Sequence, residues 1–211
     1  MEKKFTKFSV PLGLLDYINP ILYTVTMATI LCHTGEGMPR LYWHIMHAGA
    51  VLSVLAGFVI PTGKVLVGLE IIKFRMPVSL VFCVNAGILI SGLMLFQFVM
   101  NLSPAITVTL FALIAAFLIL VYRKQKKLNT VAVLTGAFGY LLLYISLITL
   151  ALHRGLILPV VLYALAILLF VMLCGIGIRA DLKNPKVHWV IEASNVLCQL
   201  LVAVGTVTLF S

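Results

Sequence analysis

The last apolar segment of the chain, residues 187–210, carries four polar side chains whose spacing can form a site: His188, Glu192, Asn195 and Gln199. On a helix, intervals of four, three and four residues confine these side chains to an arc of about 60°. A carboxylate in a lipid-spanning helix is costly unless it faces protein or water. The pattern therefore predicts a polar site inside the protein, with Glu192 acting as a proton carrier or as the partner of a cation.

Two polar residues from other apolar segments, Asn85 and Tyr140, are expected at a similar depth. Amide and phenol groups both donate and accept hydrogen bonds, which suits a polar solute. The sequence thus predicts a substrate-binding site made of Glu192, Asn195, Gln199, Asn85 and Tyr140. The alternative is a hydrogen-bond network that only holds the helices together.

A second group of polar residues is expected at the other side of the membrane. It comprises four histidines: His33, His44, His47 and His153. Neutral imidazoles bind zinc, and two of them from different helices can ligate a haem iron. These four residues are the predicted metal ligands. The alternative is that they are interfacial residues close to the lipid headgroups, like the neighbouring Tyr42 and Trp43.

Composition decides what kind of element must position these residues. Of the 211 residues, 63% are hydrophobic and 10% are charged, whereas soluble domains carry roughly 25% charged residues. Each apolar stretch is close to the roughly 20 residues that a helix needs to cross hydrocarbon. The stretches predict seven transmembrane helices, near 16–33, 41–62, 76–100, 103–122, 130–152, 156–178 and 187–210.

Basic residues predict the orientation of this bundle. With the N-terminus in the cytoplasm, thirteen of the 15 Lys and Arg residues fall on the cytoplasmic side: Lys3, Lys4, Lys7, Lys64, Lys73, Arg75, Arg123, Lys124, Lys126, Lys127, Arg179, Lys183 and Lys186. Only Arg40 and Arg154 fall outside. Cytoplasmic loops of membrane proteins are enriched in Lys and Arg, so we expect a cytoplasmic N-terminus and an extracytoplasmic C-terminus. The net charge of +9 then reflects topology and anionic lipid headgroups rather than nucleic acid.

Short connections between the segments predict a single transmembrane domain over residues 1–211. Residues 1–15 are expected at the inner membrane surface, with Leu12 and Leu14 among the side chains touching lipid. Residues 61–63 (Pro-Thr-Gly) predict the end of the second span, and residues 64–75 predict an amphipathic cytoplasmic connector with Glu70 and Lys73 facing water. Four glycines are expected to let helices approach closely: Gly87, Gly92, Gly136 and Gly139.

Three classes of function remain open at this point. The first is a membrane carrier or ligand-binding protein for a small solute, with its site on the seventh helix centred on Glu192. The second is a redox subunit that binds haem b or a quinone at the outer histidines. The third is an intramembrane metallohydrolase acting on lipid, so the sequence leaves open whether the protein is an enzyme.

The sequence also predicts the partners and the location of the protein. The partners are the lipid bilayer and a small solute or lipid, with no nucleic acid, and a homo-oligomer or a partner subunit stays open. We expect a multi-pass protein of a prokaryotic plasma membrane.

Overall fold

The computed structural model describes residues 9–72, 77–179 and 185–211, with side chains for all of these except 176–179 and 185–186. The regular structure within those ranges is entirely α-helical. The helices are α1 (Val10–Asp16), α2 (Ile18–Thr34), α3 (Arg40–Gly68), α4 (Val78–Val99), α5 (Pro104–Gln125), α6 (Leu128–His153), α7 (Ile157–Arg179) and α8 (Pro185–Phe210).

Seven helical segments are long and apolar enough to cross a membrane, which confirms the number of spans predicted from the sequence. The first span, Val10–Thr34, consists of α1 and α2 together, and each of the helices from α3 to α8 supplies one more. The fold is therefore an all-helical bundle. Its orientation relative to the cytoplasm stays a prediction.

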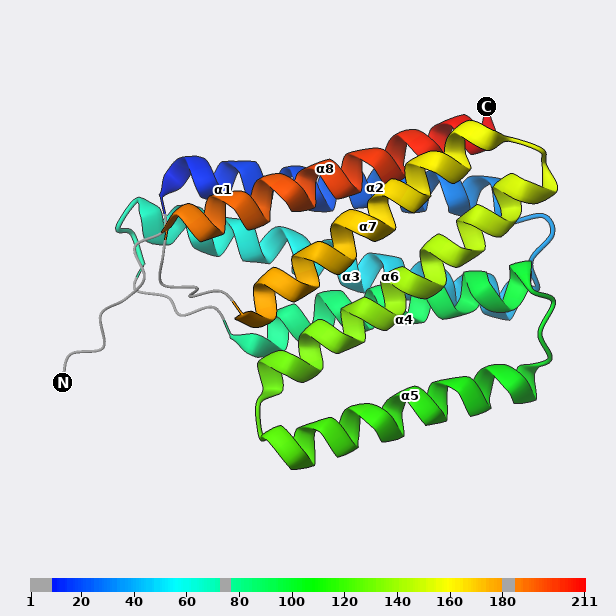
Figure 1. Ribbon diagram of the computed structural model, residues 1–211, viewed down its shortest axis with the longest axis horizontal. Coiled ribbons are helices and arrows are strands. Elements are labelled where there is room, and N and C mark those ends of the chain that lie inside the picture. Colours follow the sequence, from blue (N-terminus) through cyan, green and yellow to red (C-terminus); the bar gives the residue numbers. More distant parts are fainter. Residues whose placement is uncertain (1–8, 73–76, 180–184) are drawn as a thin grey trace.

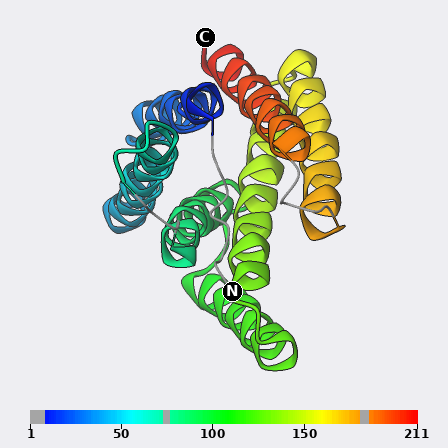
Figure 2. The ribbon, with the colours of Figure 1, turned by 90° about the vertical axis from the view of Figure 1, so that its left-hand side faces the viewer.

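Six helices form a closed ring in the order of the chain. Helix α2 packs on α3, α3 on α4, α4 on α6, α6 on α7 and α7 on α8, and α8 returns to α2 (Figure 2). Helix α5 lies outside this ring, and within the described residues it contacts only α4 and α6 (Figures 1 and 2). The ring therefore brings side chains from all six helices toward one interior.

The bundle has two ends, which we name by their residues. The basic end holds residues 123–127, where α5 meets α6, together with α1 and the N-terminal ends of α4 and α8 (Figure 1, left). The distal end holds the C-terminal ends of α2, α6 and α8 (Figure 1, right).

Glycines let α4 lie directly against its two neighbours, as predicted. A Cβ atom added to Gly87 would lie 2.4 Å from the carbonyl oxygen of Gly49 on α3. A Cβ added to Gly92 would lie 2.4 Å from the carbonyl oxygen of Gly139 on α6. Backbones this close exclude any side chain at these positions, and small residues of this kind allow close helix packing within membranes.

The second span continues well beyond the end predicted for it at Pro61. Helix α3 runs through Pro61 and Lys64 to Gly68, so the prediction of a helix end at residues 61–63 is wrong. A proline removes one backbone donor but does not have to end a transmembrane helix, because neighbouring groups satisfy the backbone. The first residues of the predicted connector 64–75 are therefore helical, Glu70 is exposed, and Lys73 lies outside the described residues.

The first span is interrupted between α1 and α2. Pro20 has no N–H to donate to the carbonyl of Asp16, which is the last residue of α1. Helix α1 packs closely on α3, as a Cβ added to Gly13 would lie only 2.8 Å from Cγ2 of Val65. Leu12 is consequently buried, whereas the sequence predicted that it touches lipid. The break places the Asp16 carboxylate beside α3.

Candidate functional site

Three ionisable side chains from three helices meet inside the bundle. The Lys64 ammonium lies 2.6 Å from Oε1 of Glu192 and 2.7 Å from Oδ2 of Asp16. The exposed fractions of these side chains are 9% for Lys64, 10% for Asp16 and 11% for Glu192. We refer to Asp16, Lys64 and Glu192 as the ionic triad.

The helices position the ionic triad through local features of the sequence. Asp16 is held at the break before Pro20, on a helix that Gly13 allows to lie against α3. Glu192 lies about two turns into α8. On the same side of the bundle, the Tyr17 hydroxyl and Oγ1 of Thr62 lie 2.7 Å apart and join α3 to the broken first span. The triad thus depends on the proline break as well as on the packing.

The charges of the ionic triad do not balance by themselves. One ammonium faces two carboxylates, so the group carries one negative charge when both carboxylates are ionised. Uncompensated charge inside a bilayer costs several kcal/mol, and a bound proton or a small cation would remove it. Among these three side chains, one negative charge is therefore left to be offset by a proton, a cation or another basic group.

A cavity of about 260 Å³ lies in the centre of the ring, next to the ionic triad. Asp16 belongs to both the triad and the cavity wall. All six helices of the ring contribute to the wall, and its members include Asn19, Tyr23, Ser53, Gly57, Asn85, Ile88, Gly136, Tyr140, Phe170, Asn195 and Gln199. The wall combines apolar faces with amide, hydroxyl and phenol groups.

Hydrogen bonds hold part of this polar lining in place. The Gln199 amide donates to the Tyr140 hydroxyl at 2.8 Å, and the Asn85 amide donates to the carbonyl of Ala132 at 2.9 Å. The Asn19 amide donates to Oδ1 of Asp16 at 3.1 Å, which ties the wall to the ionic triad. The lining is therefore preorganised around the cavity.

One buried oxygen atom in the wall, Oδ1 of Asn19, is without a hydrogen-bond partner among the described residues. The buried hydroxyl of Tyr23, by contrast, lies beside the hydroxyls of Ser53 and Ser91, which can hydrogen-bond to it. Buried polar atoms in proteins nearly always have a partner. A polar ligand in the cavity would supply that partner for Asn19.

The structure brings the predicted binding residues together. Asn85, Tyr140, Asn195 and Gln199 all line the one cavity, although they come from three different helices. Glu192 lies behind this wall and is joined to it through Lys64 and Asp16. His188, the fourth member of the predicted helical face, is half-buried one turn nearer the start of α8.

Sequence reasoning missed Lys64, which the prediction counted as a cytoplasmic loop residue. The structure places it inside the bundle, where it is buried. A signal was present in the sequence, because the apolar residues Val65, Leu66 and Val67 follow it directly and continue the helical segment. A lysine between apolar residues of one helix is expected to be paired.

The four outer histidines do not assemble into one site. His33 stacks on Phe210 with ring centroids 4.8 Å apart, whereas His44 and His47 both contact Trp43, at 5.2 and 5.1 Å. All four side chains, including His153, are exposed. Within residues 9–72, 77–179 and 185–211, no three His, Cys, Asp or Glu side chains lie close enough together to hold a metal ion. The haem, quinone and zinc predictions therefore gain no support from this geometry.

The seven apolar helices and the buried polar interior support an integral, multi-pass membrane protein. No family model matches the chain, and no curated protein and no solved structure matches it.

Proposed function

We propose that the protein is a membrane carrier for a small polar solute, which binds in the cavity at the centre of the ring. The observation that carries the proposal is the position of this cavity, which is lined by all six ring helices and lies next to a buried ionic triad. Solute sites of secondary transporters lie between helices within the membrane, and intramembrane carboxylates commonly mark ion pathways.

The chemistry of the wall indicates the class of solute. At about 260 Å³ the cavity is smaller than the roughly 300–1,000 Å³ of typical ligand pockets. Asn19, Asn195 and Gln199 offer amide groups, and Phe170 offers an aromatic face. These groups suit a small, uncharged or zwitterionic solute with several hydrogen-bonding groups and a limited apolar part.

One helix break and one missing helix hydrogen bond next to the cavity support movement between two states. Pro20 interrupts the first span, and Pro61 removes the backbone donor that would bond to the carbonyl of Gly57. Both Pro20 and Gly57 line the cavity. A discontinuous helix at a central site, such as the first span here, is typical of carriers that expose the site to one side of the membrane at a time.

The ionic triad supplies a coupling device in this proposal. A proton or a cation neutralises the negative charge left over by Lys64, and Asn19 connects Asp16 to the solute cavity. Uptake of the positive charge therefore changes the wall that the solute contacts. The cytoplasmic N-terminus, the prokaryotic plasma membrane and any homo-oligomer or partner subunit stay predictions of the sequence.

Binding is tested first on the purified protein in detergent. Thermal unfolding is measured with alanine, glucose, uridine and glycerol, which represent four classes of small polar solute. A compound that raises the melting temperature is then offered in labelled form to proteoliposomes. We expect saturable uptake that Gln199→Leu abolishes and that Gln125→Leu, a matched change at an exposed helix end, leaves intact.

The outcomes separate the carrier from a protein that only binds its ligand. Stabilisation by a solute without uptake above that of empty liposomes would favour a ligand-binding protein. Stabilisation that Gln199→Leu does not alter would place the solute outside the cavity and overturn the assignment of the site.

A further inference from the structure

A second cavity lies on the outside of the ring, between α5 and the neighbouring helices α4 and α6. Its volume is about 480 Å³. Its wall is hydrocarbon apart from the hydroxyls of Tyr122 and Thr135, and it includes Phe82, Ile90, Phe111 and Leu118. In a membrane, the outer surface of the bundle contacts lipid acyl chains, so an apolar groove on this surface fits an acyl chain.

The length of the groove corresponds to one leaflet of a bilayer. Along α5 its wall extends from Phe111 to Tyr122, which is about 16 Å of helix. The hydrocarbon core of a bilayer is roughly 30 Å thick, so one leaflet contributes about half of that. The groove ends at Tyr122 and Leu128, at the basic end of the bundle.

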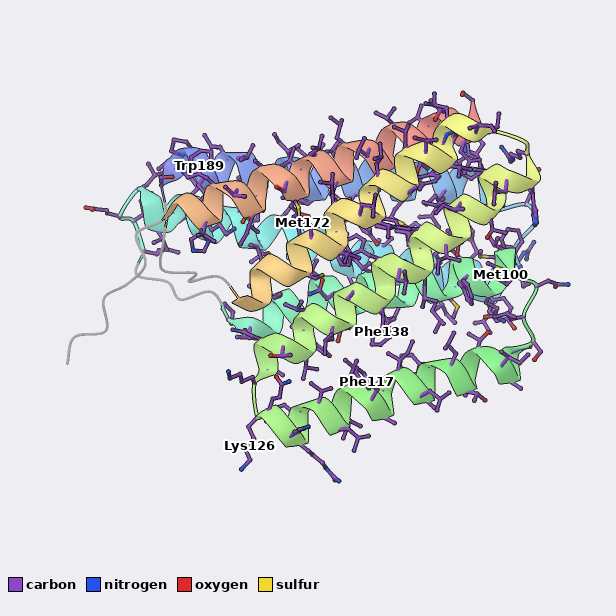
Figure 3. The ribbon with its side chains drawn as sticks, in the orientation of Figure 1. Met100, Phe117, Lys126, Phe138, Met172 and Trp189 are labelled. Atoms are coloured by element: carbon purple, nitrogen blue, oxygen red, sulfur yellow. The ribbon has the colours of Figure 1, made fainter. Side chains whose placement is uncertain are left out.

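Four positive charges lie where the groove opens at that end. Arg123, Lys124, Lys126 and Lys127 lie in sequence between the wall residues Tyr122 and Leu128, and all four side chains are exposed. Lys126 adopts a left-handed conformation with φ of 52°, which ends α5 and turns the chain toward α6 (Figure 3). No acidic residue occurs between residues 71 and 180, so this positive charge is not neutralised by nearby carboxylates in the sequence.

Contacts of α5 leave this groove open. Phe117 and Phe138 meet edge to face with ring centroids 5.8 Å apart and join α5 to α6 (Figure 3). Neither residue lines the groove, whose wall comes from α4, α5 and the first turns of α6. Helix α5 is thus anchored to α6 while a chain-sized space remains beside it.

We propose that this groove binds a phospholipid with an anionic headgroup, taken from the leaflet at the basic end. One acyl chain lies between α4 and α5, and the phosphate and the headgroup charge lie against the four basic side chains. Basic residues beside a groove between transmembrane helices are suited to anionic headgroups, each contributing electrostatic attraction. The site is independent of the solute cavity, which lies inside the ring.

The test compares two lipids that differ only in headgroup charge. The full-length protein in detergent is mixed with phosphatidylglycerol or phosphatidylcholine of identical acyl chains, and retained lipid is counted by native mass spectrometry. We expect the wild-type protein to retain phosphatidylglycerol about tenfold better than phosphatidylcholine. Equal retention of the two lipids would overturn the proposal.

Two variants separate the headgroup contact from the groove. Replacing Arg123, Lys124, Lys126 and Lys127 together by Gln changes only exposed side chains, and we expect it to bring the two lipids to equal retention. Ala115→Trp fills the groove and should remove both lipids, whereas Leu168→Trp, at a residue of α7 that is 67% exposed, should remove neither.

Results opposite to these expectations would either exclude the basic residues as the headgroup site or identify a different occupant of the groove. A preference for phosphatidylglycerol that survives the four Gln substitutions would exclude the basic cluster. A wild-type dimer that Ala115→Trp converts to a monomer with unchanged lipid retention would show that a second copy of the chain occupies the groove. The Gln variant tests the proposal even where Ala115→Trp does not fold, because its four positions lie on the surface.

Discussion

Nζ of Lys64 lies 2.6 Å from Oε1 of Glu192, although the two residues are 128 positions apart in the sequence. This contact joins the second span to the last near the basic end of the bundle. The side chains of both residues are almost fully buried, so removing either partner would leave a charge with little access to solvent.

Removing the ammonium should destabilise the fold. Lys64→Met leaves the carboxylates of Asp16 and Glu192 buried without their cation, and breaking a buried ion pair in this way costs about 3–5 kcal/mol. We expect a clearly lower melting temperature of the purified protein in detergent. Combining Lys64→Met with Asp16→Asn and Glu192→Gln should recover most of the loss, because no net charge then remains buried. A Lys64→Met protein that melts like the wild type would contradict the ion-pair geometry.

Neutralising Glu192 should affect coupling more than folding. Glu192→Gln leaves a balanced pair of Lys64 and Asp16 at 2.7 Å, so the variant should fold. It should lose solute-dependent proton movement, measured with a pH-sensitive dye inside proteoliposomes. Glu70→Gln, which changes an exposed glutamate near the same end of the bundle, is the matched control. Unchanged proton movement in Glu192→Gln would refute the coupling role.

Adding one methyl group at Gly136 should disturb the solute cavity. Its Cβ would lie 2.4 Å from Oδ1 of Asn85, so this side chain must move and release the carbonyl of Ala132. We expect Gly136→Ala to weaken solute binding about tenfold in titrations that follow the thermal shift, because the displaced Asn85 amide no longer faces the solute and a hydrogen bond of this kind contributes roughly 1 kcal/mol or somewhat more.

A double-mutant cycle identifies the cause of that effect. In an Asn85→Ala background, Gly136→Ala should cost no further affinity, because the obstructed side chain is already gone. Gly175→Ala is the neutral control, since a Cβ at Gly175 meets nothing within 4 Å. Additive losses in the double variant would show that Gly136 acts on the solute without Asn85.

The crossing of α4 and α6 should tolerate no side chain at all. A Cβ on Gly139 would lie 2.6 Å from the backbone nitrogen of Leu89, and backbone cannot turn aside as a flexible side chain does. We expect Gly139→Ala to lower the free energy of unfolding by about 1–3 kcal/mol, the usual cost of overpacking. Reversible unfolding in detergent measures this change, and a Gly139→Ala protein as stable as Gly175→Ala would contradict the close approach of the two backbones.

The sequence gives a good account of the spans and of one half of the site. Continuous apolar runs of about 20 residues allow few alternatives to transmembrane helices, which is why the number of spans is predicted correctly. The helical spacing of Glu192, Asn195 and Gln199 places them on one face whatever the neighbours are. Asn195 and Gln199 do line the cavity, and Glu192 is joined to the wall residue Asp16 through Lys64.

The other half of the site could not be read from local patterns. Lys64 follows a proline and a glycine, and such a position usually ends a helix and lies in a loop. Only the packed bundle shows that α3 continues to Gly68 and that Asp16 approaches it from the broken first span. The outer histidines show the opposite case. They are expected at a similar depth in the membrane, yet His33 packs on Phe210, whereas His44 and His47 pack on Trp43.

The sequence by itself thus determined that this chain forms seven apolar helices with a polar face on the last one, because hydrophobicity and helical period are local properties of a chain in lipid. The tertiary structure alone decided that Lys64 lies between Asp16 and Glu192, and that six of the helices line one cavity. Charge pairing across helices depends on how glycines and proline breaks let backbones approach. The distance between two helix backbones is set by the packing of the whole bundle and by no single segment.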